Sequence, residues 1–183
     1  MSNEEDLFLI QKISVGDSKA FESLLSKYKT SVFGLCRRLL GEKSMAEDLT
    51  QETWIKVVES SAQYRPTGSV QSWILTISRN LCLNHMRKSS WEELTNEEGS
   101  LDPEDPTESL EQLLISEQNQ QALKLAFDNL PPQQRAALVL RLSADLSYAQ
   151  IATEMQVSVD SVKVLIHRGK LHLQKTLGVR IHE

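Results

Sequence analysis

Long apolar runs, closely spaced cysteines and abundant aromatic residues are all missing from this sequence. No apolar stretch approaches the length needed to cross a membrane, and the acidic start, Met1 to Asp6, is not followed by the apolar core of a secretion signal. Cys36 and Cys82 lie inside apolar helical patterns and form no CxxC motif, which favours buried free thiols over a disulfide or a metal site. Aromatic residues make up 5% of the chain, too few for one large aromatic core. We expect a soluble, cytoplasmic protein with no metal, no cofactor and no membrane insertion.

Acidic residues are absent from residues 60–91, which hold four basic side chains, although the chain of 183 residues has a formal net charge of −5. Residues 92–117 hold ten acidic side chains and no basic one, so the net acidity is confined to this segment. An acidic stretch between two mildly basic segments is typical of a linker. The acid-free stretch is where a nucleic-acid partner is expected.

Helical spacing of apolar residues dominates the first sixty residues. A short helix is predicted over 7–13 and a long amphipathic one over 20–40, with Gly41 as its C-cap. Ser44 and Glu47 have the spacing of a capping box, which predicts the start of a further helix. The buried face of that helix is expected to hold Leu49, Thr53, Val57 and Val58.

The other face of this third helix carries acidic and amide side chains beside a tryptophan. Such a face fits a protein interaction surface, because tryptophan is enriched where interfaces bind most strongly. The alternative is a solvated face with the tryptophan in the core, and composition alone favours this alternative. The residues concerned are Asp48, Gln51, Glu52, Trp54 and Lys56.

Pro66 and Gly68 predict a loop over 63–69, followed by an amphipathic helix over 70–88. One side of this helix is expected to be apolar, through Ile74, Ile77 and Leu81. The opposite side combines cations that hold phosphates with amides that pair with base edges, the mixture that single-stranded nucleic acid requires. The alternative is an ordinary helix with Trp73 in the core. The polar side holds Ser72, Thr76, Arg79, Asn80 and Arg87, with Trp73 and Asn84 at its border.

The last third of the chain has the pattern of a helix-turn-helix. A helix over 133–142 is followed by Ser147 and Ser158, which are expected to cap a short helix and a longer one over 159–177. The longer helix has an outward face suited to a major groove and its phosphates. An all-helical packing module that binds no DNA is the alternative. The outward face carries Lys163, Val164, His167, Arg168 and Lys170.

Five segments of the chain are weak signals singly, but their order and spacing taken together are characteristic of one family. They are 20–28 (AFESLLSKY), 46–54 (AEDLTQETW), 72–80 (SWILTISRN), 130–135 (LPPQQR) and 146–152 (LSYAQIA). In these segments the chain resembles the extracytoplasmic-function (ECF) sigma factors of bacterial RNA polymerase. The resemblance implies an all-α protein of two small helical domains joined by an acidic flexible linker. Residues 1–90 would form a domain like sigma region 2, residues 91–112 the linker, and residues 113–183 a domain like region 4 with the helix-turn-helix.

The resemblance also implies a function and partners. The protein would bind core RNA polymerase, through the clamp coiled coil of the largest subunit and the flap of the second, and would direct it to promoter DNA and help to melt it. Regulation by an anti-sigma factor is implied as well. The implied polymerase-docking residues are Asp48, Gln51, Glu52, Trp54 and Lys56. The implied minus-ten and melting residues are Tyr64, Arg65, Ser72, Trp73, Thr76, Arg79, Asn80, Asn84, Arg87 and Lys88. The implied minus-thirty-five residues are Ser147, Tyr148, Ser158, Asp160, Ser161, Lys163, Val164, His167, Arg168 and Lys170.

Four positions depart from the family pattern, and two other functional classes remain open. Asn84 replaces a common acid, Gln156 stands where a turn glycine is frequent, and Val164 and Leu165 replace polar and arginine residues. A stand-alone transcription regulator would bind duplex DNA without polymerase, and a helical adaptor or anti-sigma-type protein would bind no DNA. An enzyme is disfavoured, because no nucleophile–base pair or paired carboxylates stand out.

Overall fold

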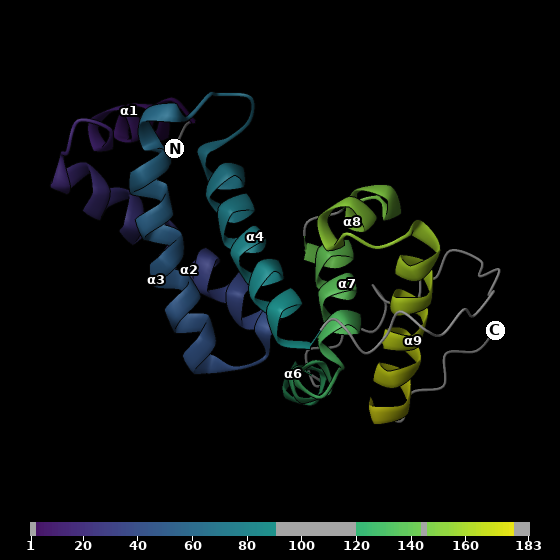
Figure 1. Cartoon of the computed structure of the whole chain (residues 1–183). Helices are drawn as coiled ribbons and strands as arrows, with labels where there is room; N and C mark the ends of the chain where they lie inside the picture. Colours follow the sequence, from purple (N-terminus) through teal and green to yellow (C-terminus); the bar gives the residue numbers. More distant parts are fainter. Residues whose placement is uncertain (1–2, 91–119, 144–145, 178–183) are drawn as a thin grey trace. The chain divides into compact units, whose positions relative to one another are not determined.

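The computed structural model describes residues 3–90, 120–143 and 146–177, and within these ranges every regular element is a helix. The chain divides into two compact units, Met1–His85 and Met86–Glu183 (Figure 1). The expected all-α fold is thereby confirmed. The acidic linker predicted over 91–112 lies outside the described residues. No helix within the described ranges has the length and apolar character needed to cross a bilayer.

The first unit begins with α1 (Asn3–Ile13) and α2 (Ser18–Leu40), followed by α3 (Lys43–Ser60) and the short 3-10 turn η1 (Ser61–Gln63). It ends within α4 (Val70–Ser90), whose residues from Met86 onward belong to the second unit. Asp17 caps α2, since its Oδ1 accepts hydrogen bonds from the backbone amides of Lys19 at 2.9 Å and Ala20 at 3.1 Å. Gly41 ends α2 in the left-handed conformation with φ of 76°, as its position in the sequence predicts.

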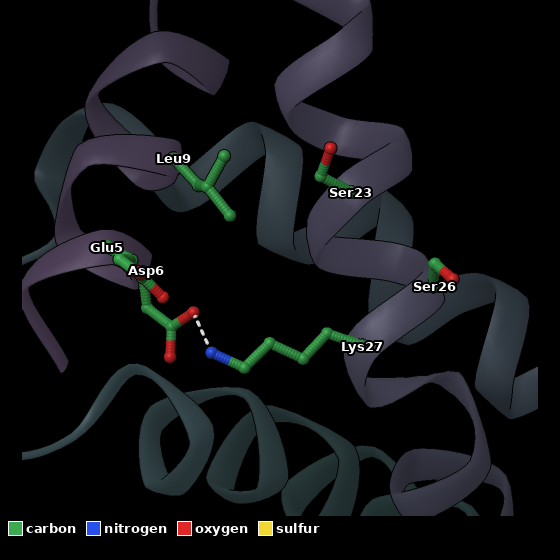
Figure 2. A pocket seen from close by; sticks show the side chains of 6 residues that line it. All are labelled: Glu5, Asp6, Leu9, Ser23, Ser26 and Lys27. Carbon is green, nitrogen blue, oxygen red and sulfur yellow. Dashed lines mark hydrogen bonds and ion pairs between the residues drawn. The ribbon is translucent and has the colours of Figure 1, made fainter. Parts of the chain in front are cut away.

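A buried carboxylate fastens α1 to α2. Asp6 is 4% exposed, and it accepts hydrogen bonds from Lys27 Nζ and from the Tyr28 hydroxyl, both at 2.5 Å. Figure 2 shows the Lys27 side chain reaching toward Asp6. Both residues line a groove of about 340 Å³ together with Leu9 and Ser23. The hydrogen bond that Lys27 donates to Asp6 raises the pKa of Lys27. The helix α1 also packs against η1, so this ion pair fixes a helix that supports the start of the loop before α4.

Two sequence predictions about α3 are wrong. The helix begins at Lys43 with Glu42 as N-cap, and Ser44 donates to Glu42 Oε1 at 2.6 Å instead of capping the helix. Val58, expected in the core, is 44% exposed. The buried line consists of Ala46, Leu49, Thr53, Trp54 and Val57. Thr53 is accommodated there because its hydroxyl donates to the carbonyl of Leu49 at 2.7 Å.

The buried side of α4 is rotated slightly from the predicted one. Ile74 is buried as expected, but Ile77 and Leu81 are only half-buried. Ser78 and Cys82 take the central positions, both fully buried. The Ser78 hydroxyl lies 3.1 Å from the Cys36 sulfur of α2, which satisfies a polar group inside the core. The expectation that both cysteines are buried free thiols is confirmed.

The second unit contains α6 (Gln120–Asp128), α7 (Pro132–Ser143), α8 (Tyr148–Met155) and α9 (Val159–Leu177). The helix α9 packs against each of the other three (Figure 1). At the crossing of α7 and α9, Gly169 lies so close to Leu138 that an added Cβ would be 2.8 Å from its Cδ1. This close crossing fixes the direction of α9 within its unit.

Candidate nucleic-acid interface

A closed loop precedes α4. The Tyr64 and Trp73 rings lie with their centroids 4.7 Å apart at an angle of 59°, and the Tyr64 hydroxyl donates to the carbonyl of Gly68 at 3.1 Å. Ser69 then begins the helix, because its hydroxyl accepts from the Ser72 backbone amide at 3.1 Å. The loop therefore has a defined shape, closed by the contact between Tyr64 at its start and Trp73 in the first turn of α4.

The exposed stripe of α4 follows directly from the loop. Residues Ser72, Asn80, Asn84 and Lys88 are exposed and Thr76 is half-buried, and they recur every four residues. The hydroxyls of Ser72 and Thr76 donate to backbone carbonyls one turn earlier, at 2.8 Å each. Within the described part of the chain no hydrogen bond is recorded for the amides of Asn80 and Asn84. These two amides can therefore donate to, and accept from, an unpaired base.

Three arginines lie in the loop and along α4. Arg65 in the loop is exposed, and Arg79 and Arg87 are half-buried along α4. Trp73 is half-buried against Tyr64. It is therefore neither a core residue nor a fully exposed one, and it lies between the two predicted positions. The arrangement combines cations for phosphates with amides for base edges on a face that lacks acidic groups.

The polar residues of the predicted docking face of α3 lie exposed on the helix, but its tryptophan does not. Asp48, Gln51, Glu52 and Lys56 are exposed. Trp54 is 5% exposed and meets the Phe21 ring edge-on, with centroids 6.1 Å apart. The structure thus places Trp54 in the core, where it supports the exposed face from beneath.

Sequence reasoning missed two apolar residues on the same face of α3. Ile55 is 57% exposed and Val58 is 44% exposed. Ile55 follows Gln51 by four residues and Glu52 by three, and Val58 follows Ile55 by three. Because residues three or four apart are neighbours on a helix surface, these residues share one side of α3. That spacing was visible in the sequence, but Val58 was assigned to the buried side. Exposed apolar residues within an acidic face are suited to protein contact.

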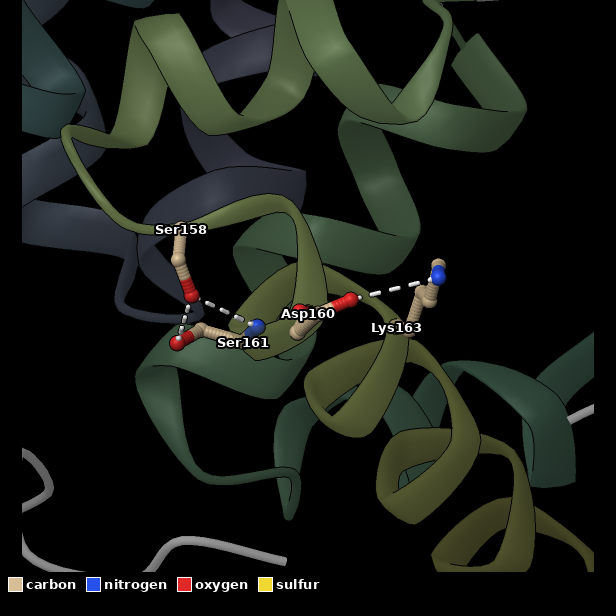
Figure 3. Close-up of polar contacts among 4 residues, drawn as sticks. All are labelled: Ser158, Asp160, Ser161 and Lys163. Carbon is tan, nitrogen blue, oxygen red and sulfur yellow. Dashed lines mark hydrogen bonds and ion pairs between the residues drawn. The ribbon is translucent and has the colours of Figure 1, made fainter. Parts of the chain in front are cut away.

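The helix-turn-helix has the predicted caps. The Ser147 hydroxyl accepts from the Gln150 amide at 3.3 Å while the Gln150 side chain accepts from the Ser147 amide at 2.9 Å, a complete capping box. Ser158 caps α9, since its hydroxyl accepts from the Ser161 amide at 3.1 Å (Figure 3). Gln156 joins the two helices with φ of 57° and ψ of 44°, the left-handed conformation that glycine usually provides.

The outward side of α9 carries the predicted polar residues. Ser158, Asp160 and Ser161 are exposed at its start, and Lys163 pairs with Asp160 at 3.2 Å (Figure 3). Burial lowers the pKa of Lys170. Leu165, the fourth departure from the family pattern, is buried and makes no part of this surface. The half-buried members are Tyr148 on α8 and Lys163, Val164, His167, Arg168 and Lys170 on α9.

Comparison with known families assigns both units. Residues 24–92 match Sigma-70 region 2, and residues 120–173 match Sigma-70, region 4. ECF RNA polymerase sigma factor SigW of Bacillus subtilis is 30% identical, over 92% of this chain and 94% of its own. The chain belongs to the ECF sigma factors of bacterial RNA polymerase. The RNA polymerase sigma-H factor of Pseudomonas aeruginosa is 28% identical over 100% of this chain and 99% of its own.

The fold of this sigma factor is also that of a solved relative. Sigma factor RpoE, crystallised with the anti-sigma factor NepR from Bartonella quintana, superposes with a TM-score of 0.58 at 23% identity, covering 89% of this chain and 99% of that one. Membership of the ECF sigma factors, shown by the family matches and by SigW, sets aside the stand-alone regulator and the adaptor in favour of a transcription initiation factor that binds core polymerase and promoter DNA. The exposed faces of α3 and α4 lie in the region 2 match, and α8 and α9 up to residue 173 lie in the region 4 match.

Proposed function

We propose that this sigma factor opens promoter DNA with the loop over 64–69 and the exposed stripe of α4. The observation that carries the proposal is the pair of exposed amides, Asn80 and Asn84, on an acid-free face inside the region 2 match. Unstacking a base from a duplex costs a few kcal/mol. A surface that binds only the unstacked base shifts the equilibrium toward the open form by its differential affinity. Arg65, Arg79, Arg87 and Lys88 would hold the phosphates of the same strand.

A second part of the proposal concerns docking and duplex reading. The exposed side of α3 would dock on the polymerase clamp coiled coil, with Asp48, Gln51 and Glu52 around the apolar Ile55. The outward side of α9 would enter the major groove at the minus-thirty-five element. The ion pair between Lys163 and Asp160 does not prevent this, because an exposed pair of this kind contributes little and is readily exchanged for a phosphate.

Regulation and chemistry complete the proposal. A separate anti-sigma factor would hold this protein inactive, as the crystallised RpoE is bound by NepR. Nucleotide addition would belong to the polymerase, and the sigma factor would contribute binding energy and no active site. It would act where the polymerase acts, in the cytoplasm. Deleting the anti-sigma factor should raise transcription from the promoters that this sigma factor directs.

The test is Asn80→Ala in the complete holoenzyme. Losing the hydrogen bonds of one amide should weaken open-complex formation by about 3- to 10-fold, since each net bond contributes about 1 kcal/mol. Binding to the closed duplex should change little. A promoter carrying a fluorescent base in the minus-ten element reports opening, and a mobility shift at low temperature reports duplex binding. Gln71→Ala is the matched control, an exposed amide on the same helix outside the stripe. Equal loss of both activities would sink the proposal.

A further inference from the structure

Tyr64 closes the loop over 64–69 through contacts within the protein. Its hydroxyl spans the loop and donates to the carbonyl of Gly68 at 3.1 Å, while its ring rests on Trp73, three residues inside α4. Within the loop, the Thr67 amide donates to the carbonyl of Arg65 at 2.8 Å. The loop joins the upper ends of η1 and α4 in Figure 1. Both of its ends are therefore held by one side chain.

These contacts restrict what Tyr64 can offer to a base. A phenol has one proton to donate, and the proton of Tyr64 is already donated to Gly68. A tyrosine hydroxyl, with an ordinary pKa of about 10, keeps its proton at neutral pH, and burial raises the pKa of Tyr64 further. One side of the ring is covered by Trp73 at a centroid distance of 4.7 Å. A direct hydrogen bond from Tyr64 to DNA would have to break the loop closure first.

A closed loop also changes the cost of binding. A mobile loop that must be ordered when a ligand arrives lowers the affinity by the entropy lost, whereas a loop fixed during folding does not. Val70, fully buried at the first position of α4, anchors the far end of the segment. The Ser69 hydroxyl and carbonyl both bond to Ser72, which fixes the junction.

We propose that Tyr64 is a positioning residue that holds the loop over 64–69, through the Gly68 carbonyl and the Trp73 ring, in the shape that receives an unpaired base. The inference rests on the proposed function of the α4 stripe and deepens it. Tyr64 then acts through the loop, and the base contacts come from Asn80, Asn84 and the loop backbone.

The test compares Tyr64→Phe with the wild type in the holoenzyme. Phenylalanine keeps the ring contact with Trp73 and removes only the bond to Gly68. We expect a fluorescent single-stranded oligonucleotide, carrying the minus-ten sequence of a promoter that the wild-type holoenzyme transcribes, to bind about 3- to 10-fold more weakly. We also expect faster hydrogen exchange of the amides over 65–69 in the isolated variant, with exchange in α2 unchanged. Ser26→Ala, which removes an exposed hydroxyl in the same unit, is the control and should change neither.

Three results would overturn the inference. Unchanged oligonucleotide binding by Tyr64→Phe would show that the ring alone suffices, as a direct stacking role requires. Weaker binding with unchanged exchange over 65–69 would mean that the hydroxyl touches DNA. If the wild-type holoenzyme does not prefer the minus-ten oligonucleotide to a scrambled one, the proposed function of the α4 stripe fails, and the inference fails with it. The first two results leave that proposed function intact.

Discussion

Replacing Gln156 by glycine should stabilise the second unit. Gln156 is the one non-glycine residue with positive φ in the described ranges, at 57°, and it ends α8 by donating its amide to the carbonyls of Ala152 and Thr153. Its side chain is exposed, so its removal sacrifices no packing. The amide that makes the cap is part of the backbone and remains in the variant.

The size of the effect is a difference between two terms. A residue with a Cβ loses about 1–2 kcal/mol in the left-handed conformation. Glycine avoids this strain, but its greater freedom in the unfolded chain costs about 0.5–1 kcal/mol. The net gain is about 0.5–1 kcal/mol. For a unit of this size, that corresponds to a rise in melting temperature of about 2–8 °C.

Gln156→Ala is the decisive control, because alanine removes the same side chain atoms beyond Cβ but keeps the strain. Hydrogen exchange of the buried α8 and α9 amides in the full chain would report the stability of this unit alone. Slower exchange in Gln156→Gly together with little change in Gln156→Ala is the expected result. An equal gain in both variants would refute the strain argument, and no gain in the glycine variant would refute the magnitude.

Three further predictions concern packing, the buried ion pair and docking. Gly169→Ala should destabilise the second unit by about 1–3 kcal/mol, because its methyl group would lie 2.8 Å from the Leu138 side chain. Gly34→Ala, whose added methyl group has its nearest neighbouring atom at 3.6 Å, should stabilise the protein by about 0.5–1 kcal/mol. Urea unfolding measures both changes, and a change in stability of the same sign for both variants would contradict the argument. Asp6→Ala should cost about 2–3 kcal/mol at neutral pH, since a charge-assisted hydrogen bond is lost. Because the folded pKa of Lys27 is raised, its contribution is complete below about pH 10 and is lost as pH rises through the folded pKa, so urea midpoints should fall with alkaline pH in the wild type and less in Asp6→Ala. Ile55→Ala should weaken assembly with core polymerase by about 5- to 30-fold without lowering stability, and unchanged assembly in a titration would remove Ile55 from the docking face.

Helices were predictable from this sequence because their signals are local. The apolar period from 20 to 40 and the glycine that follows it depend on one helix and its cap, and α2 ends at the predicted residue. The serines at 147 and 158 lie at the starts of α8 and α9 for the same reason. Each of these features is decided by residues within one turn of the chain.

The residues that each helix buries were less predictable than the helices themselves, because the neighbouring helix decides which side is buried. A hydroxyl at 78 would be placed on the polar side of α4 by composition alone. Ser78 is buried because Cys36 on α2 provides a hydrogen-bond partner at 3.1 Å. The buried side of α4 is therefore centred on Ser78 and leaves Ile77 and Leu81 half-buried. The capping box at Ser44 failed for a related reason: α3 begins at Lys43, one residue before Ser44, so that serine already lies inside the helix.

The candidate site shows the same division. Its residue types and the acid-free character of the segment were evident from the sequence, but the closure of the loop was not. A tyrosine hydroxyl bonded to the carbonyl of Gly68 is a contact between a side chain and a backbone atom, and no spacing of residue types encodes it. Trp54 illustrates the opposite case, because its core position beside Phe21 was the alternative that composition favoured.

On the proposed function, the hydrogen bonds along the loop and α4 explain how one face could both hold its shape and read a base. Tyr64, Ser72 and Thr76 donate their protons to carbonyl groups of their own chain, so a base that bonded to them as an acceptor would have to replace a bond already made. Asn80 and Asn84 are exposed and have no such bond within the described ranges, so a new bond to a base replaces only water. The hydroxyls therefore fix the surface, and on the proposed function the amides one and two turns further along α4 would distinguish an unstacked base from a stacked one.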